Sequence, residues 1–104
     1  MKVTKKLLIK HKACYSAIDE FIELKLEGID VYDLIKLLHD RKDHNGYSDW
    51  LFTRLKLTGE CIGYNRDGSV CYIYNYKNGV RYGECTYYYR DGSVSYIENY
   101  KNGE

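Results

Sequence analysis

Hydrophobic residues follow two different periodicities along this chain, and the change falls near its middle. Up to about residue 56, apolar side chains recur every three or four positions, which is the spacing of one face of an α-helix. From residue 59 onward, apolar and aromatic side chains alternate with polar ones, as in half-buried β-strands. The pattern predicts an α+β fold, with helices in the first half and strands in the second.

The first half begins with two predicted helices. Thr4 is a suitable N-cap for a short helix that ends near Lys10. A second helix is predicted over about 13–27, where Gly28 provides a C-terminal stop. Its apolar stripe consists of Cys14, Ala17, Ile18, Phe21, Ile22 and Leu24.

Two further helices are predicted before the change of pattern. Asp30 begins a third helix, with Asp33 in the position of a capping box. A polar loop over 40–46 follows, and Ser48 is predicted to cap a fourth helix over 49–56. The apolar residues of these two helices are Val31, Leu34, Ile35, Leu37, Leu38, Trp50, Leu51, Phe52 and Leu55.

The second half contains a tandem repeat. Residues 59–79 read GECIGYNRDGSVCYIYNYKNG, and residues 83–103 read GECTYYYRDGSVSYIENYKNG. The offset is 24 residues throughout, and 16 of the 21 aligned positions are identical. A match of this length in a chain of 104 residues indicates one structural unit used twice.

Each repeat contains dipeptides that favour tight turns. Asp67-Gly68 and Asp91-Gly92 are predicted to form two-residue type I′ turns, because both residue types tolerate positive φ. Asn78-Gly79 gives the same signal between the repeats, and Asn102-Gly103 repeats it at the end. The strands are then predicted at about 59–66, 69–77, 80–90 and 93–101, with 56–58 extending the first. Paired in sequential order, they form an antiparallel meander of four to five strands.

Two-residue turns fix the strand register, so the side chains can be assigned to two faces. We call the aromatic one the tyrosine face and the other one the aliphatic face. The tyrosine face is predicted to carry Cys61, Gly63, Val70, Tyr72, Tyr74, Tyr76, Gly83, Cys85, Tyr87, Tyr89, Val94, Tyr96 and Tyr100. The aliphatic face is predicted to carry Ile62, Tyr64, Cys71, Ile73, Tyr82, Thr86, Tyr88, Ser95 and Ile97. Tyr74 should lie across from Gly83, and Tyr72 near Gly63. We expect the aliphatic face to help receive the helices and the tyrosine face to remain open.

The repeat resembles the MORN type, especially the variant of bacterial YwqK-family antitoxin-like proteins. The resemblance covers residues 57–104 and rests on Asn78-Gly79-Val80-Arg81-Tyr82-Gly83-Glu84, Tyr87-Tyr88-Tyr89, Asp91-Gly92 and Tyr100-Lys101-Asn102-Gly103. It implies a β-meander that binds a partner, although repeats of this kind serve many binding roles. The expected organisation is a helical cap over 1–56 and a repeat meander over 57–104, folding as one cooperative unit.

The helical half is similar to a small helical segment found in many phage and mobile-element proteins. The similarity is carried by Ala13-Cys14-x-x-Ala17-Ile18, Leu34-Ile35-x-x-Leu38 and Asp49-Trp50-Leu51-Phe52-x-x-Leu55. It implies a phage or bacterial conflict setting, with an antitoxin-like, immunity or anti-defence role.

Composition narrows the class of partner. Lys and Arg number 16 against 15 Asp and Glu, so the net charge of +1 argues against a general nucleic-acid binder and against an acidic DNA mimic. The chain has 13 Tyr, a residue favoured at contact surfaces because its ring packs while its hydroxyl stays hydrated. The sequence contains no secretory signal and no apolar run of about 20 residues, so we expect a cytoplasmic protein without a membrane segment.

Cysteine and histidine positions do not favour catalysis or metal binding. The cysteines are Cys14, Cys61, Cys71 and Cys85, and none forms a Cys-x-x-Cys pair. Cys61 and Cys85 occupy equivalent repeat positions in a sheet without histidine, so a packing role is favoured over nucleophilic catalysis. The other candidate cluster is His39, Asp40, Asp43 and His44, whose spacing matches no metal motif and favours a solvated loop. We therefore expect neither an enzyme nor a cofactor.

The sequence thus predicts a non-catalytic protein-binding module, with inhibition or neutralisation of a partner, such as a toxin or a defence-complex subunit, as its most plausible role. The predicted contact residues are Tyr72, Tyr74, Tyr87, Tyr89, Tyr96, Arg66 and Arg90. One alternative is a phage-encoded anti-defence protein that blocks a nucleic-acid-processing complex, as an anti-CRISPR protein does. Another is a nucleic-acid or anionic-lipid binder, through Lys2, Lys5, Lys6, Lys10, His11 and Lys12. The last strand could also pair with a second copy of the chain, giving a homodimer.

Overall fold

The computed structural model describes residues 1–101 and has the α+β architecture that the sequence predicts, with four helices and a mostly antiparallel sheet of five strands. These residues form two compact units, the first Met1–Leu37 and the second starting at Leu38. Helix α3 (Val31–Asp40) runs across this division. The boundary predicted at residue 56 does not coincide with it, because α4 belongs to the same unit as the sheet. The predicted Asn102-Gly103 turn lies outside the described residues.

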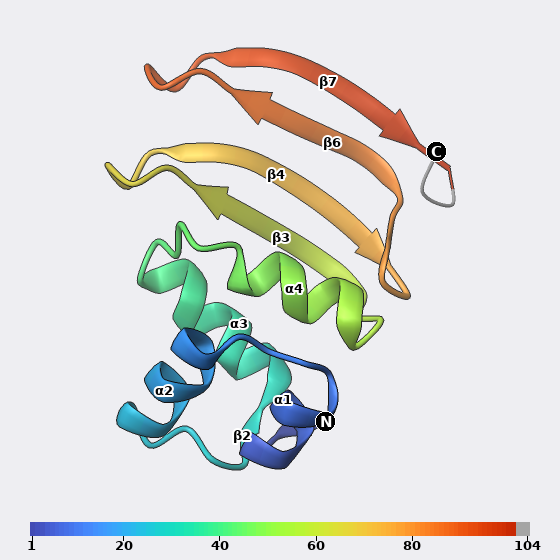
Figure 1. Ribbon diagram of the computed structural model, residues 1–104. Coiled ribbons are helices and arrows are strands. Elements are labelled where there is room, and N and C mark those ends of the chain that lie inside the picture. Colours follow the sequence, from blue (N-terminus) through green and yellow to red (C-terminus); the bar gives the residue numbers. More distant parts are fainter. Residues whose placement is uncertain (102–104) are drawn as a thin grey trace. The chain divides into compact units, whose positions relative to one another are not determined.

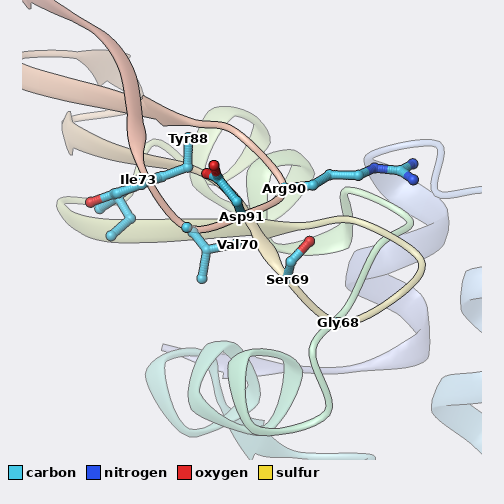
Figure 2. A pocket seen from close by; sticks show the side chains of 8 residues that line it. Gly68, Ser69, Val70, Ile73, Tyr88, Arg90 and Asp91 are labelled. Carbon is cyan, nitrogen blue, oxygen red and sulfur yellow. The ribbon is translucent and has the colours of Figure 1, made fainter.

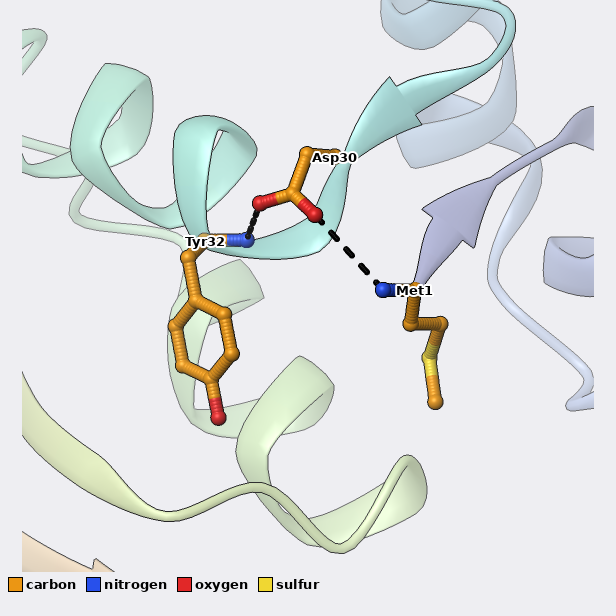
Figure 3. Close-up of polar contacts among 3 residues, drawn as sticks. All are labelled: Met1, Asp30 and Tyr32. Atoms are coloured by element: carbon orange, nitrogen blue, oxygen red, sulfur yellow. Dashed lines mark hydrogen bonds and ion pairs between the residues drawn. The ribbon is translucent and has the colours of Figure 1, made fainter.

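The first unit consists of β1 (Lys2–Val3), α1 (Lys5–Lys10), α2 (Tyr15–Glu23), β2 (Ile29–Asp30) and most of α3. Strands β1 and β2 pair antiparallel and were not predicted. The Met1 ammonium lies 3.6 Å from the Asp30 carboxylate, which also accepts a hydrogen bond of 3.0 Å from the Tyr32 backbone N–H, as Figure 3 shows. The core of this unit contains Val3, Leu8, Ile18, Phe21, Val31, Leu34 and Ile35.

The helix boundaries in the first unit follow their capping residues. Thr4 caps α1 as predicted, because its hydroxyl accepts a hydrogen bond of 3.0 Å from the Leu7 N–H. Helix α2 is shorter than the predicted range of 13–27: its C-cap is Leu24, and Lys25 adopts a left-handed φ of 55° that no helix can continue. Gly28 therefore lies beyond the end of α2 rather than at it.

The second unit contains α4 (Tyr47–Arg54), β3 (Gly59–Tyr64), β4 (Val70–Lys77), β5 (Val80–Arg81), β6 (Gly83–Tyr88) and β7 (Val94–Tyr100). The strands follow the predicted meander order β3-β4-β6-β7, with β5 paired to β4, and α4 runs beside β3 (Figure 1). Ser48 does not cap α4, contrary to the prediction. The helix starts two residues earlier, after a left-handed Gly46, and the Asp43 carboxylate accepts the Tyr47 N–H at 2.9 Å.

Of the three predicted type I′ turns in the described residues, the one between the repeats is confirmed. Asn78 and Gly79 both have positive φ, 52° and 82°. The Asp-Gly turns differ: Gly68 and Gly92 are left-handed, whereas their aspartates are not. Each is a three-residue loop in which the aspartate carboxylate accepts a hydrogen bond from the serine N–H that follows the glycine, at 2.9 Å in both repeats.

The register between the two repeats is shifted from the predicted one. The predicted third strand is interrupted at Tyr82, which separates β5 from β6 and donates its N–H to the Asn75 carbonyl at 2.9 Å. Strand β4 therefore pairs with β6 as Tyr72↔Tyr87, which sets Tyr74 level with Cys85 rather than with Gly83. Because this shift is two residues, it moves no side chain to the other face. The predicted face is nevertheless wrong for Val70 and Val94, because a register irregularity next to each Asp-Gly loop pairs them with Tyr64 and Tyr88 of the aliphatic face. The predicted neighbours Gly63 and Tyr72 are confirmed as partners.

Candidate functional site

Helix α4 covers the tyrosine face over the first repeat. The Asp49 carboxylate accepts hydrogen bonds from the hydroxyls of Tyr72 and Tyr76, the latter at 2.6 Å. The Phe52 ring stacks on the Tyr76 ring, with centroids 5.1 Å apart. The prediction that the aliphatic face receives this helix is therefore wrong. The helix packs on the tyrosine face, where Asp49 supplies the acceptor that the partly buried hydroxyls of Tyr72 and Tyr76 need.

Two glycines and a cysteine allow this close packing. A Cβ atom at Gly63 would overlap the Tyr72 ring, and one at Gly59 would lie 3.5 Å from the Phe52 ring. Cys61 is completely buried below α4, and burial raises the pKa of its thiol to about 12. Such a thiol is inert as a nucleophile, which supports the packing role expected for this residue.

The second repeat reproduces the strand pairing of the first. Gly59↔Tyr76 in the first hairpin corresponds to Gly83↔Tyr100 in the second, and Gly63↔Tyr72 corresponds to Tyr87↔Tyr96. The pairing register shifts at the equivalent place in both hairpins, between Gly63 and Tyr64 in the first and between Tyr87 and Tyr88 in the second. The difference lies in what covers them: Tyr96 is 50 % exposed whereas its counterpart Tyr72 is half-buried, and Tyr100 is half-buried whereas its counterpart Tyr76 is only 5 % exposed.

Tyrosine rings run from the covered hairpin into the exposed one. Tyr74 meets Tyr87 edge to face at 5.5 Å, and Tyr87 stacks on Tyr96 at 4.3 Å. Tyr87 occupies the position that Gly63 has in the first repeat, so the Tyr96 ring lies against another ring instead of against bare backbone. The stack therefore holds Tyr96 away from the sheet and toward solvent.

Arg81 borders this row of rings. Its guanidinium carbon lies 4.0 Å from the centroid of Tyr74 and 5.5 Å from that of Tyr100, and it donates a hydrogen bond of 3.2 Å to the Tyr100 hydroxyl. The Tyr100 hydroxyl in turn donates to the Glu98 carboxylate at 2.9 Å. We call the surface formed by Arg81, Tyr87, Tyr96, Glu98 and Tyr100 the second-hairpin surface.

The structure separates the predicted contact residues into packed and accessible ones. Tyr72 and Tyr74 belong to the α4-covered part, Tyr87 is half-buried within the ring row, and Tyr89 and Tyr96 are exposed. Arg66 and Arg90 are exposed in the two Asp-Gly loops. Sequence reasoning missed Arg81, although the repeat held a signal, since the equivalent position of the first repeat is Leu57.

A shallow pocket lies between the two Asp-Gly loops. Gly68, Ser69, Val70, Ile73, Tyr88, Arg90, Asp91 and Gly92 line it. Figure 2 shows the Arg90 guanidinium pointing away from Ile73 and Tyr88, so the charged group lies at the rim. No group of catalytic side chains converges on it within the described lining, and the pocket offers mainly apolar surface to a ligand.

The histidine predicted as a metal candidate has another partner. The Nε2 atom of His39 accepts a hydrogen bond of 3.2 Å from the Ile62 N–H, and burial lowers the pKa of His39. Within residues 1–101, no group of three or more His, Cys, Asp and Glu side chains is arranged to hold a metal ion. None of the helices in this range is long and apolar enough to cross a membrane.

Comparison of the chain with protein-family models, with curated proteins and with solved structures finds no match. The surface geometry alone therefore indicates the function, and the MORN-like resemblance stays a prediction.

Proposed function

We propose that this protein is a non-catalytic binding module that contacts a partner protein through its second repeat. One observation carries the proposal: among the described residues of the second unit, every exposed large hydrophobic side chain belongs to residues 80–97. They are Val80, Tyr82, Tyr89, Val94, Tyr96 and Ile97, between 44 % and 58 % exposed.

Tyr96, one of these residues, lies on the second-hairpin surface, whose composition fits protein recognition. Tyrosine and arginine are enriched at the energetic centres of protein interfaces, and the second-hairpin surface combines Tyr87, Tyr96 and Tyr100 with Arg81. The rings are held by stacking, and Arg81 is held by its hydrogen bond, so little side-chain freedom is lost on binding. A rigid, partly apolar surface of this kind favours binding over turnover.

Inhibition or neutralisation of the bound partner is the role we favour. The buried Cys61 thiol has a raised pKa, and His39 uses its acceptor nitrogen on the backbone. The protein would then act by occupying a surface of its partner, as an antitoxin-like or immunity protein does.

Site-specific photo-crosslinking in the native host tests this proposal. Tyr96 is replaced by p-benzoylphenylalanine, and in a matched control the same residue replaces Tyr15, which is 87 % exposed in the first unit. We expect one dominant crosslinked protein from position 96 and none from position 15. Equal crosslinking at both positions, or no crosslinking at position 96, would contradict the proposed binding surface.

A further inference from the structure

The internal repeat supplies a template for what covers the second-hairpin surface. In the first hairpin, the occupant of the tyrosine face is a helix, α4, that presents a carboxylate at Asp49 and an aromatic ring at Phe52, three residues later. We propose that the second-hairpin surface receives a helix of the partner protein in the same way, with an acidic residue followed three positions later by an aromatic one. This inference rests on the proposed binding function and specifies its partner.

The two hairpins are equivalent in their strand pairing. The pairs Gly59↔Tyr76 and Cys61↔Tyr74, over which α4 lies, have the counterparts Gly83↔Tyr100 and Cys85↔Glu98. Both cysteines are completely buried, Cys61 below α4 and Cys85 within the second hairpin. A helix that packs on the strand pairs of the first hairpin therefore finds the same backbone arrangement in the second.

The second hairpin also has free space above its glycine, Gly83. In the first hairpin a Cβ atom at Gly59 would contact Phe52, whereas a Cβ atom at Gly83 would find nothing within 4 Å. The place that the aromatic ring of α4 fills in the first repeat is therefore open in the second. Two strand spacings amount to roughly 9.5 Å, close to the 8–10 Å of packed helices. A second helix on the sheet could lie beside α4 without displacing it.

The second hairpin also differs from the first in charge. Arg81 replaces the Leu57 of the first repeat and places a cation between the two hairpins, where it lies against Tyr74 and beside Tyr76 and donates a hydrogen bond to the Tyr100 hydroxyl. Within residues 1–101 the Tyr96 hydroxyl has no hydrogen-bond partner, whereas its counterpart Tyr72 donates to Asp49. A guanidinium and a hydroxyl donor on one surface favour a carboxylate on the incoming helix.

Glu98 limits where that carboxylate can bind. It already accepts the Tyr100 hydroxyl, the role that Asp49 has toward Tyr76 in the first hairpin. The incoming acid is therefore directed to Arg81 and Tyr96 instead of to Tyr100. This difference distinguishes the second site from a simple copy of the first, and Arg81 and Tyr96 become the residues whose removal weakens binding most.

A peptide with the sequence of α4 and its flanks, residues 46–57 (GYSDWLFTRLKL), is the probe. It is titrated into the ¹⁵N-labelled full chain and followed by amide chemical shifts. We expect saturable shifts at millimolar peptide, because so short a helix is marginally stable alone, and we expect them centred on residues 83–87 and 96–100. Arg81→Ala and Tyr96→Ala should each weaken binding at least five-fold, whereas Ser95→Ala, on the aliphatic face, should change it less than two-fold. A peptide with D49A and F52A should produce no saturable shifts.

Four outcomes would overturn the inference. The shifts could centre on the first hairpin, which would mean that the peptide replaces the protein's own α4. They could be absent or lie on the aliphatic face. The same signals could also shift with protein concentration alone, which would make a second copy the occupant. In any of these cases, specific crosslinking from position 96 would still support the proposed function, so the two statements fail separately.

Discussion

Replacing Gly63 with alanine tests the packing of α4 on the first hairpin. The Tyr72 ring lies so close to Gly63 that an added Cβ would overlap it, and Gly63 has no positive φ that could complicate the interpretation. The ring must lift, and its hydroxyl then loses Asp49. Overpacking costs about 1–3 kcal/mol, and a lost hydrogen bond to a charged group adds about 1.5–3 kcal/mol. Removing a glycine from a strand returns about 0.5–1 kcal/mol, so we expect a net loss of roughly 2–5 kcal/mol.

The measurement is urea unfolding of the wild type and Gly63→Ala, with Tyr72→Ala and the double variant completing a mutant cycle. In the Tyr72→Ala background, Gly63→Ala should cost less than about 0.5 kcal/mol, because no ring remains to be displaced. A Gly63→Ala cost below about 1 kcal/mol, or an equal cost in both backgrounds, would refute the packing described for Tyr72.

Three further predictions concern side chains around the sheet. Asp49→Ala should lower the unfolding free energy by about 2–4 kcal/mol, since it leaves two tyrosine hydroxyls without their acceptor; a change below 0.5 kcal/mol in urea unfolding would contradict this. His39 has a pKa below its ordinary value of about 6.5, so its contribution to stability is present above that pH and is lost as the pH falls below it; unfolding midpoints between pH 7.5 and 5.0 should drop in the wild type more than in His39→Leu. Ellman's reagent should modify Cys14, whose pKa the hydrogen bond with Ser16 lowers, far faster than the buried Cys61, and similar rates would argue against the burial described.

The sequence predicted the strand order and most of the side-chain faces because the repeat determines the turns. It missed the faces of Val70 and Val94, because the irregularity beside each Asp-Gly loop has no sequence signal of its own. The Asn78-Gly79 turn requires positive φ at two successive positions, which few residue pairs other than Asn-Gly satisfy. The Asp-Gly loops show the limit of this reasoning, since the same glycine also suits a three-residue loop in which the aspartate caps the following serine. The register shift at Tyr82 left the faces intact because it spans an even number of residues.

The covered face could not be predicted from periodicity. Tyrosines that alternate with polar residues along a strand are equally compatible with an exposed face and with a face packed against a helix. Two residues determine that the face is covered. Asp49 is a charged residue on α4 that a sequence pattern assigns to solvent, yet it accepts the Tyr72 hydroxyl. Gly63 has no side chain, so the Tyr72 ring can pack against its backbone. The hydroxyls of Tyr72 and Tyr76 on β4 need a hydrogen-bond acceptor, and only the three-dimensional structure shows that Asp49 provides it.

The central claim is that the second repeat binds a protein through Tyr96 and its neighbours. The most direct measurement is the affinity of the crosslinked partner, once identified and purified, for the wild type, Tyr96→Ala and Tyr15→Ala by isothermal titration calorimetry. Truncating a central interface tyrosine costs at least about 2 kcal/mol, which corresponds to roughly a 30-fold rise in Kd. We expect that loss for Tyr96→Ala and a change below two-fold for Tyr15→Ala. Unchanged affinity of a folded Tyr96→Ala variant would contradict the claim.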